Sequence, residues 1–232
     1  MDTDMPNERF GESFERIRAM DASLGAQLEA FSESLRLRRP DFAAAVDRLI
    51  ERLRQNGAGE QAPQPGDLMP PFVLPDDTGR MVNLEQLTAA GPVAVTFHRG
   101  HWCPYCRISI KALAQAHAKA AESGGQIVAI MPDRQPFTAE IRDQAAVRFP
   151  ILTDIDNGYA LSLNLTIFVG DELRTFMQGR HDLPSFQGND AWMLPIPATF
   201  VVGHDGRIKA RFVDPDYRRR MAIDDLLAAL RS

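Results

Sequence analysis

Cysteine is scarce in this sequence, with two residues among 232, and long apolar runs are absent. Two thiols cannot build the disulfide framework that stabilises small secreted proteins. No segment approaches the run of about 18 apolar residues that crosses a bilayer. The N-terminus, "MDTDMPNERFGESFERIRAM", is charged and has no apolar run like that of a signal peptide. We therefore expect a cytoplasmic protein, in which a close cysteine pair is more often catalytic or metal-binding than structural.

An excess of positive charge is also missing. The net charge is -5 at pH 7, so the chain has no basic field to attract nucleic acid or acidic lipid. Neither is expected as a partner. Hydrophobic residues make up 44% of the sequence, which is ordinary for a globular protein, and the length is sufficient to bury a core without cross-links.

The first quarter of the chain has the pattern of a helical arm. Apolar residues spaced by three, four and seven run from Phe10 to Leu35 and mark one face of a long helix. A second, shorter helix is expected after Pro40. The apolar face should pack on the rest of the chain or on a second copy, and we favour a homodimer slightly. The predicted units are an N-terminal helical arm at 1–55, a Gly- and Pro-rich linker at 56–66 and a globular domain at 67–232.

Beyond the linker, short apolar runs alternate with helical patterns. Hairpins are predicted at 72–84 and 198–213, buried strands at 92–97, 126–131 and 149–152, and helices at 108–121, 137–148, 156–165 and 222–232. This order predicts an α/β fold in which a mixed central sheet is flanked by helices. Residues 166–192 carry turn residues without a clear period, and we interpret them as an insertion.

Both cysteines lie in "FHRGHWCPYC", residues 97–106, between a predicted strand and a predicted helix. Cys103 should lie at the helix N-cap and Cys106 in the first turn, where free N–H groups and the helix dipole favour an anion. The pKa of a thiol at such a position falls from about 8.5 to between about 3.5 and 7.5, and Arg99 could lower it further. We expect Cys103, nearer the loop, to be the exposed nucleophile and Cys106 to be the resolving thiol. Residues three apart on a helix are neighbours, so a disulfide between them is sterically easy.

Two other interpretations of these cysteines stay open. They could be small buried hydrophobic residues that happen to be close. Alternatively, His98, His101, Cys103 and Cys106 form the pattern H-x-x-H-x-C-x-x-C and could bind zinc in a non-catalytic module.

Four segments resemble the peroxiredoxin-like branch of the alkyl hydroperoxide reductase/thiol-specific antioxidant (AhpC/TSA) group, within the thioredoxin-fold superfamily. They are "FVLPDDTGRMVNL", "VTFHRGHWCPYC", "FPILTD" and "IPATFVVGHDGRI". The resemblance covers roughly the C-terminal 165 residues and implies a thioredoxin-like fold after the arm. It also implies that Pro197 is the proline that faces the active site, joined to Ile196 by a cis bond.

The sequence departs from the family pattern around the cysteines. Ordinary peroxiredoxins carry P-x-x-x-T-x-x-C and a nearby arginine, and counting from the strand places Cys106 at the position of their peroxidatic cysteine. Cys103 then replaces the threonine, Arg99 replaces the proline, and Pro197 lies where the arginine is expected. The thioredoxin residues are present instead, as Trp102, Cys103, Cys106 and Pro197, and the intervening Pro104-Tyr105 matches glutaredoxin.

The resemblance implies an antioxidant thiol oxidoreductase that reduces peroxides and is regenerated by thioredoxin or a glutathione system. The catalytic residues would be Cys103, Cys106 and Pro197, and no metal or organic cofactor is expected. The alternative is a disulfide reductase with little peroxidase activity. His101 could tune the thiolate, and Tyr105 could flank the substrate. We expect Trp192 to pack in the core and "YRRRM", residues 217–221, to be a solvated charge run.

Overall fold

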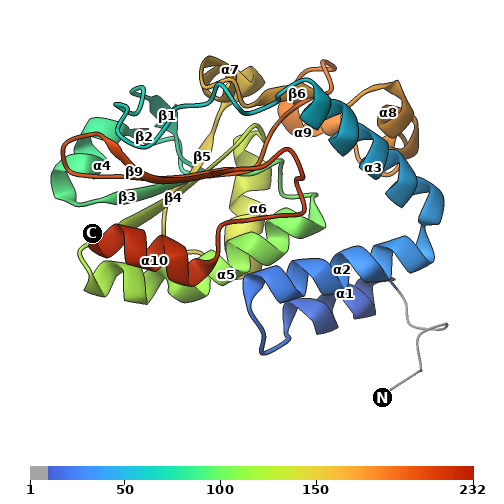
Figure 1. The fold of residues 1–232 in the computed structure, drawn as a ribbon, viewed down its shortest axis with the longest axis horizontal. Helices are drawn as coiled ribbons and strands as arrows, with labels where there is room; N and C mark the ends of the chain where they lie inside the picture. The colour runs from blue at the N-terminus through green and yellow to red at the C-terminus, as the bar shows by residue number, and fades with distance from the viewer. Residues whose placement is uncertain (1–9) are drawn as a thin grey trace.

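The central sheet of the computed structural model, which describes residues 10–232, contains parallel and antiparallel neighbours. Its strand order is β5-β4-β3-β8-β9 (Figure 1). β3 lies parallel to β4 and antiparallel to β8. The bounds are β3 (Val93–Phe97), β4 (Gln126–Met131), β5 (Ile151–Thr153), β8 (Ala198–Val202) and β9 (Ile208–Val213). The mixed sheet and the C-terminal hairpin are therefore confirmed.

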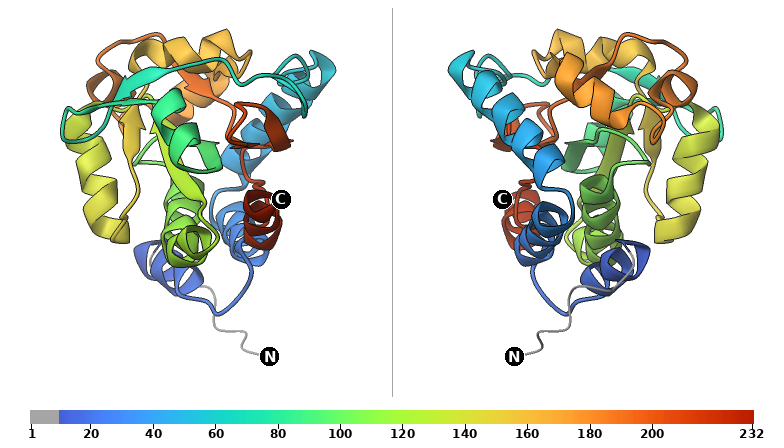
Figure 2. Two further views of the ribbon diagram at one scale, coloured as in Figure 1. Left: turned by 90° about the vertical axis from the view of Figure 1, so that its left-hand side faces the viewer. Right: turned by 90° about the vertical axis from the view of Figure 1, so that its right-hand side faces the viewer.

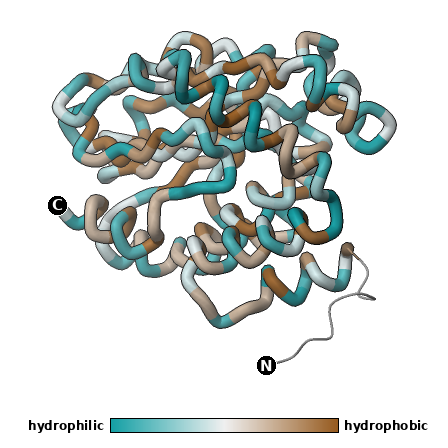
Figure 3. Tube along the Cα trace, turned by 45° about the vertical axis from the view of Figure 1, so that its right-hand side comes forward, coloured by the Kyte–Doolittle hydropathy of each residue, from teal (hydrophilic) through white to brown (hydrophobic). Residues whose placement is uncertain are grey.

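Both faces of this sheet are covered, which explains why its strands are apolar at successive positions. Ala94 and Ile127 face one layer, and Val93 and Val128 face the other. The first layer contains α5 (Pro104–Glu122), α6 (Gln135–Ala145) and α10 (Ile223–Arg231). The second contains β1 (Val73–Pro75), β2 (Met81–Asn83), α4 (Leu84–Ala90), η1 (Ile155–Asn157) and α7 (Gly158–Ser162). Figure 2 shows these layers edge-on, and Figure 3 shows hydrophobic segments concentrated in the central strands.

The N-terminal arm is built from three helices where two were predicted. These are α1 (Phe10–Arg18), α2 (Leu24–Arg38) and α3 (Pro40–Gln55). The predicted helix from Phe10 to Leu35 is broken because the Ser23 side chain accepts the N–H of Ala26 and caps a new helix. Residues 1–9 of the predicted arm lie outside the described residues.

The apolar face of the arm packs on the same chain and not only on itself. α2 lies against α5, and α3 lies against α8 (Asp171–Met177), as Figure 1 shows along the end of the sheet. Phe14, Ile17 and Phe31 share one hydrophobic cluster with residues at the start of α5. A second copy of the chain is therefore not needed to cover this face, although a homodimer stays a prediction.

The predicted insertion is more regular than its sequence suggests. It contains β6 (Thr166–Phe168), α8 and α9 (Leu183–Gln187), and β6 pairs antiparallel with β7 (Met193–Pro195). Trp192 is buried with 4% exposure in a small cluster, as predicted. The predicted linker is also held to the domain, because Gly59 accepts a hydrogen bond from Arg211.

Two further observations concern the backbone and the membrane. The predicted cis bond before Pro197 is wrong, since every peptide bond in residues 10–232 is trans. Within the same range, no helix is both long and apolar enough to span a bilayer.

Candidate active site

The two cysteines lie where β3 ends and α5 begins. Cys103 is the N-cap of α5, Pro104 occupies the first turn without needing an N–H partner, and Cys106 follows in that turn. The carbonyl of Cys103 accepts the N–H of Arg107 at 3.0 Å, which starts the helical ladder. The predicted placement of the pair at a helix N-terminus is confirmed.

Neither sulfur is at the surface. Cys103 is 1% exposed and Cys106 is 0% exposed, because α2 and its neighbours pack over the start of α5. The prediction that Cys103 is exposed is therefore wrong. The helix of the arm that covers the cysteines, α2, ends more than sixty positions before Cys103, so helical periodicity alone could not show where it docks.

Cys106 is surrounded by groups that stabilise a thiolate. Its Sγ accepts the backbone N–H of Arg99 at 3.3 Å and the Nη2–H of Arg220 at 3.5 Å. Burial alone would raise the pKa of Cys106, but hydrogen bonds from Cys103 and His98 and the charge of Arg220 lower it well below its ordinary value. These donors therefore favour the thiolate form of Cys106.

Cys103 has the opposite protonation. Burial raises the pKa of its thiol, and the hydrogen bond to the Cys106 sulfur raises it further, well above the ordinary value. The expectation of a low pKa at Cys103 is thus contradicted. The environment of the pair thus favours the thiol at Cys103 and the thiolate at Cys106.

Arg220 is a candidate site residue that the sequence did not indicate. It belongs to the run at 217–221, which we expected to be solvated, and Arg219 in that run is indeed exposed. Arg220 instead turns inward, bonds the carbonyl of Tyr217 and reaches the Cys106 sulfur. A run of three arginines carries no signal in sequence that separates the inward one from its neighbours.

Arg99 is a buried cation with no carboxylate partner among the described residues. It is 5% exposed, and its guanidinium carbon lies 3.8 Å from the centre of the Tyr217 ring and 5.2 Å from that of Trp102. Burial opposes its charge, but the neighbouring sulfurs and the Tyr217 hydroxyl raise the pKa of Arg99 above its ordinary value. The predicted support from Arg99 thus has a structural basis near both cysteines.

The two histidines of the motif diverge and do not form the zinc site considered from the sequence. His98 is buried beside Cys106, with its Nε2 atom 3.0 Å from Thr96 Oγ1. His101 instead pairs through Nδ1 with Asp133 Oδ2 at 2.8 Å and stacks on Phe137. Within residues 10–232, no three His, Cys, Asp or Glu side chains are grouped to hold a metal, so the zinc interpretation is contradicted.

The remaining predicted site residues surround the cysteines at different depths. Tyr105 is 3% exposed, and its hydroxyl lies 3.0 Å from Ser32 Oγ of α2, so it anchors the arm. Trp102 lies against His181, with ring centres 5.0 Å apart. Pro197 is buried directly before β8. Because Thr96 of β3 pairs with Thr199 of β8, Pro197 lies level with the residues that follow β3.

A small cavity of about 70 Å³ adjoins Cys103. Its wall is mostly aromatic and aliphatic, with Phe31 and Leu35 from α2 and Met177 from α8. Arg99 and His181 are polar groups on this wall, and Cys106 does not reach it. Small molecules in this cavity would therefore meet the Cys103 sulfur before that of Cys106.

Comparisons with known proteins show the family and the fold of this chain. The sequence profile of the AhpC/TSA family matches residues 65–211. None of the curated proteins matches the chain. Peroxidoxin BcpB of Mycobacterium tuberculosis is similar in structure, with 23% identity, a TM-score of 0.56, and 72% of this chain and 96% of that chain covered. Peroxiredoxin 6 of Arenicola marina gives 15% identity and a TM-score of 0.56 over 72% of each chain. The 2-Cys peroxiredoxin of Plasmodium vivax gives 15% identity and a TM-score of 0.52, with 71% of this chain and 79% of that chain covered.

Proposed function

Because the chain belongs to the AhpC/TSA family, we propose that it is a thiol oxidoreductase that reduces peroxides with the sulfur atoms of Cys103 and Cys106. The observation that carries this proposal is the pair of donors on the Cys106 sulfur, the backbone N–H of Arg99 and the guanidinium of Arg220. Hydrogen bonds and charge lower the pKa of Cys106, whereas burial raises that of Cys103. A thiolate beside a second thiol supplies both sulfur groups, one to attack and one to resolve, for a peroxide reduction that ends in a disulfide.

The protonation of the pair supports Cys106 as the attacking sulfur, which reverses our assignment from sequence. The thiolate, not the thiol, is the nucleophile, and burial and hydrogen bonding keep Cys103 protonated. Cys106 also occupies the position that the family resemblance gives to the peroxidatic cysteine. Because Cys106 is fully buried, the peroxide must enter through the cavity at Cys103, and side chains there must move to admit it.

The reaction balances within this set of groups. The Cys106 thiolate attacks the terminal oxygen of the peroxide, an S–O bond forms, and the O–O bond breaks. The leaving oxygen takes the proton of Cys103, and the positive charge of Arg99 stabilises the charge that develops there. The Cys103 thiolate then attacks the sulfenic acid at Cys106 and, with one proton from solvent, releases water and forms the disulfide.

The main alternative is the reduction of protein disulfides. A disulfide on another protein must contact an attacking sulfur directly, and both sulfurs here lie beneath α2 and α8. A cavity of about 70 Å³ has room for a small peroxide but not for a peptide segment. This burial favours peroxide as the oxidant. The identity of the reductant, thioredoxin or a small thiol, is a separate proposal.

Single-turnover kinetics of two variants test the proposal. Reduced Cys103→Ser should still react rapidly with hydrogen peroxide and leave Cys106 as a sulfenic acid, detected by mass spectrometry after trapping with dimedone. Cys106→Ser should lose the fast reaction. The wild-type protein should lose both thiols together and form the Cys103–Cys106 disulfide.

Two results would count against the proposal in different ways. A fast reaction that survives in Cys106→Ser and disappears in Cys103→Ser would return the attacking role to Cys103. If both wild-type thiols can still be alkylated after stoichiometric peroxide, the peroxidase function itself is wrong.

A further inference from the structure

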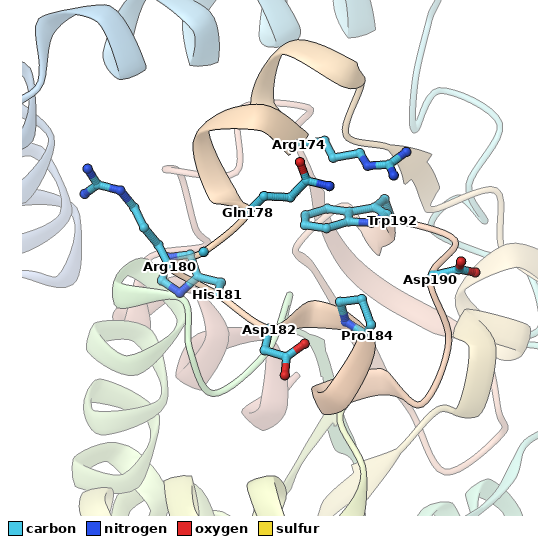
Figure 4. A pocket seen from close by; sticks show the side chains of 9 residues that line it. Arg174, Gln178, Arg180, His181, Asp182, Pro184, Asp190 and Trp192 are labelled. Atoms are coloured by element: carbon cyan, nitrogen blue, oxygen red, sulfur yellow. The ribbon is translucent and has the colours of Figure 1, made fainter.

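The segment at 166–192 forms a second cavity, which the peroxide reaction does not use. This cavity of about 520 Å³ lies among the end of α8, the turn that follows it, the start of α9 and Trp192 (Figure 4). Sites for small molecules usually measure about 300–1,000 Å³. Its size is therefore sufficient for a molecule larger than a simple peroxide.

The charges around this cavity are balanced. Arg174 and Arg180 contribute two positive charges, and Asp182 and Asp190 contribute two negative ones. None of these four side chains forms an ion pair with another residue in the range 10–232. Figure 4 shows Arg174 above the ring of Trp192, at 5.6 Å in the structure, and Asp182 on the opposite side of that ring. Separate cations and anions suit a ligand that carries both an ammonium group and carboxylates.

This cavity is adjacent to the cysteine cavity. His181 lines both, and its ring packs against Trp102, the residue before Cys103. Burial and then the charge of Arg99 lower the pKa of His181 to about 4, so the shared wall is neutral near pH 7. A ligand in the larger cavity can thus extend past the neutral ring of His181 toward Cys103.

We propose that the cavity formed by the 166–192 segment binds the reductant, and that this reductant is a low-molecular-weight thiol with zwitterionic, amino-acid-like ends. The inference deepens the proposed function, because it names the site and class of the thiol that restores the cysteines. The ends of the ligand pair with Arg174, Arg180 and Asp190, and its sulfur extends past His181 to Cys103.

The electrostatics of the cysteine pair give this reaction a direction. The bound thiolate attacks the Cys103 sulfur, a new S–S bond forms, and the Cys103–Cys106 bond breaks with Cys106 leaving as a thiolate. Cys106 is the better leaving group, since its environment lowers its pKa, and it is also the sulfur that the cavity does not reach. A second molecule of the thiol then attacks the mixed disulfide, so two thiols are oxidised to one external disulfide and both cysteines are restored.

The test starts from full-length protein whose disulfide has been formed with diamide, so it does not depend on the peroxide reaction. Reduction is followed by stopped-flow tryptophan fluorescence with glutathione, with uncharged 2-mercaptoethanol and with reduced thioredoxin. Glutathione should give a rate that saturates with concentration, and 2-mercaptoethanol a linear, slower one. S-methylglutathione, which cannot react, should bind to the protein in isothermal titration.

Variants locate the site. Arg180→Met and Asp190→Asn should each raise the glutathione concentration for half-saturation about two- to fivefold, as expected for partly exposed ion pairs, and leave the 2-mercaptoethanol rate unchanged. Arg148→Met removes an exposed arginine in the loop between α6 and β5 and should change neither. Equal, linear rates for both small thiols, acceleration by thioredoxin alone, or no binding of S-methylglutathione would each overturn the inference. Failure of the peroxide single turnover would overturn only the proposed function.

Discussion

Arg220→Met should raise the pKa of Cys106 and slow the reaction with peroxide at neutral and acidic pH. The guanidinium donates to Cys106 Sγ at 3.5 Å, and it is the one side-chain cation that bonds this sulfur in residues 10–232. A hydrogen bond to a charged group contributes about 1.5–3 kcal/mol, and about 1.4 kcal/mol corresponds to a tenfold change in the ionisation constant, or one pKa unit. Arg220 is partly solvated, which favours the lower end of this range. Arg220→Met should therefore raise the pKa of Cys106 by about one unit, and the rate should fall about tenfold at pH values below the pKa of the wild-type thiol.

The pH profile separates this electrostatic effect from misfolding. Because the lost cation destabilises only the thiolate, the rate should recover as the pH rises and the thiol of Cys106 ionises. The thiolate can be titrated directly by its ultraviolet absorbance in a Cys103→Ser background. Arg220→Lys should restore part of the effect, since it keeps the charge and changes the geometry.

Arg219→Met is the matched control, because Arg219 is the next residue in the chain and is exposed, with its guanidinium on Asp214. Its pH profile should follow that of the wild-type protein. If Arg220→Met leaves the titration unchanged, or if Arg219→Met shifts it equally, the arginine does not hold the thiolate and our electrostatic account of the site is refuted.

Two further predictions concern the arm and the stability of the fold. Phe31→Ala should lower the free energy of unfolding, measured in urea titrations, by about 3–5 kcal/mol, because Phe31 is 2% exposed and packs on Tyr105. The same variant should speed alkylation of Cys103. Phe168→Ala, at an exposed position, should change the free energy of unfolding by less than about 0.5 kcal/mol. Since the pKa of Cys106 is lower in the folded than in the unfolded chain, where it is about 8.5, the stability of the reduced protein should rise with pH between these two values, and this contribution should be absent below the lower one. Cys106→Ser should abolish this rise, and an unchanged slope would contradict the assignment of the thiolate.

The sheet and the position of the cysteines could be predicted because they depend on local patterns. Strands buried on both faces give continuous apolar runs such as 93–97, and a proline after Cys103 favours a helix start at that point. The docking of the arm could not be predicted, since an amphipathic face shows that it is buried and not what covers it. The contact from Arg220 to Cys106 joins residues 114 apart, and only the fold brings them together.

The same limit explains why the sequence favoured a thiolate at Cys103, whereas the contacts in the structure favour one at Cys106. A helix N-terminus favours an anion at either cysteine, and sequence spacing made the outer one seem the more accessible. The deciding groups come from elsewhere: the backbone of the loop after β3 and the segment before α10 both direct donors at Cys106, and the arm desolvates Cys103. Local sequence locates the redox pair, whereas tertiary contacts decide which sulfur is ionised.

The apparent loss of the peroxiredoxin residues is, on this account, a replacement of their functions. In the family pattern the residue three before the peroxidatic cysteine is a threonine, whose hydroxyl can donate a hydrogen bond. Here that residue is Cys103, and its thiol donates to Cys106. The missing arginine is replaced in charge by Arg220, which reaches the same sulfur from the other end of the chain. A cysteine at the threonine position can do what a hydroxyl cannot, because it can also condense with the sulfenic acid that forms. In the proposed mechanism, Cys103 is thus both the donor and the resolving thiol, which would explain why the two cysteines lie within the same helical turn.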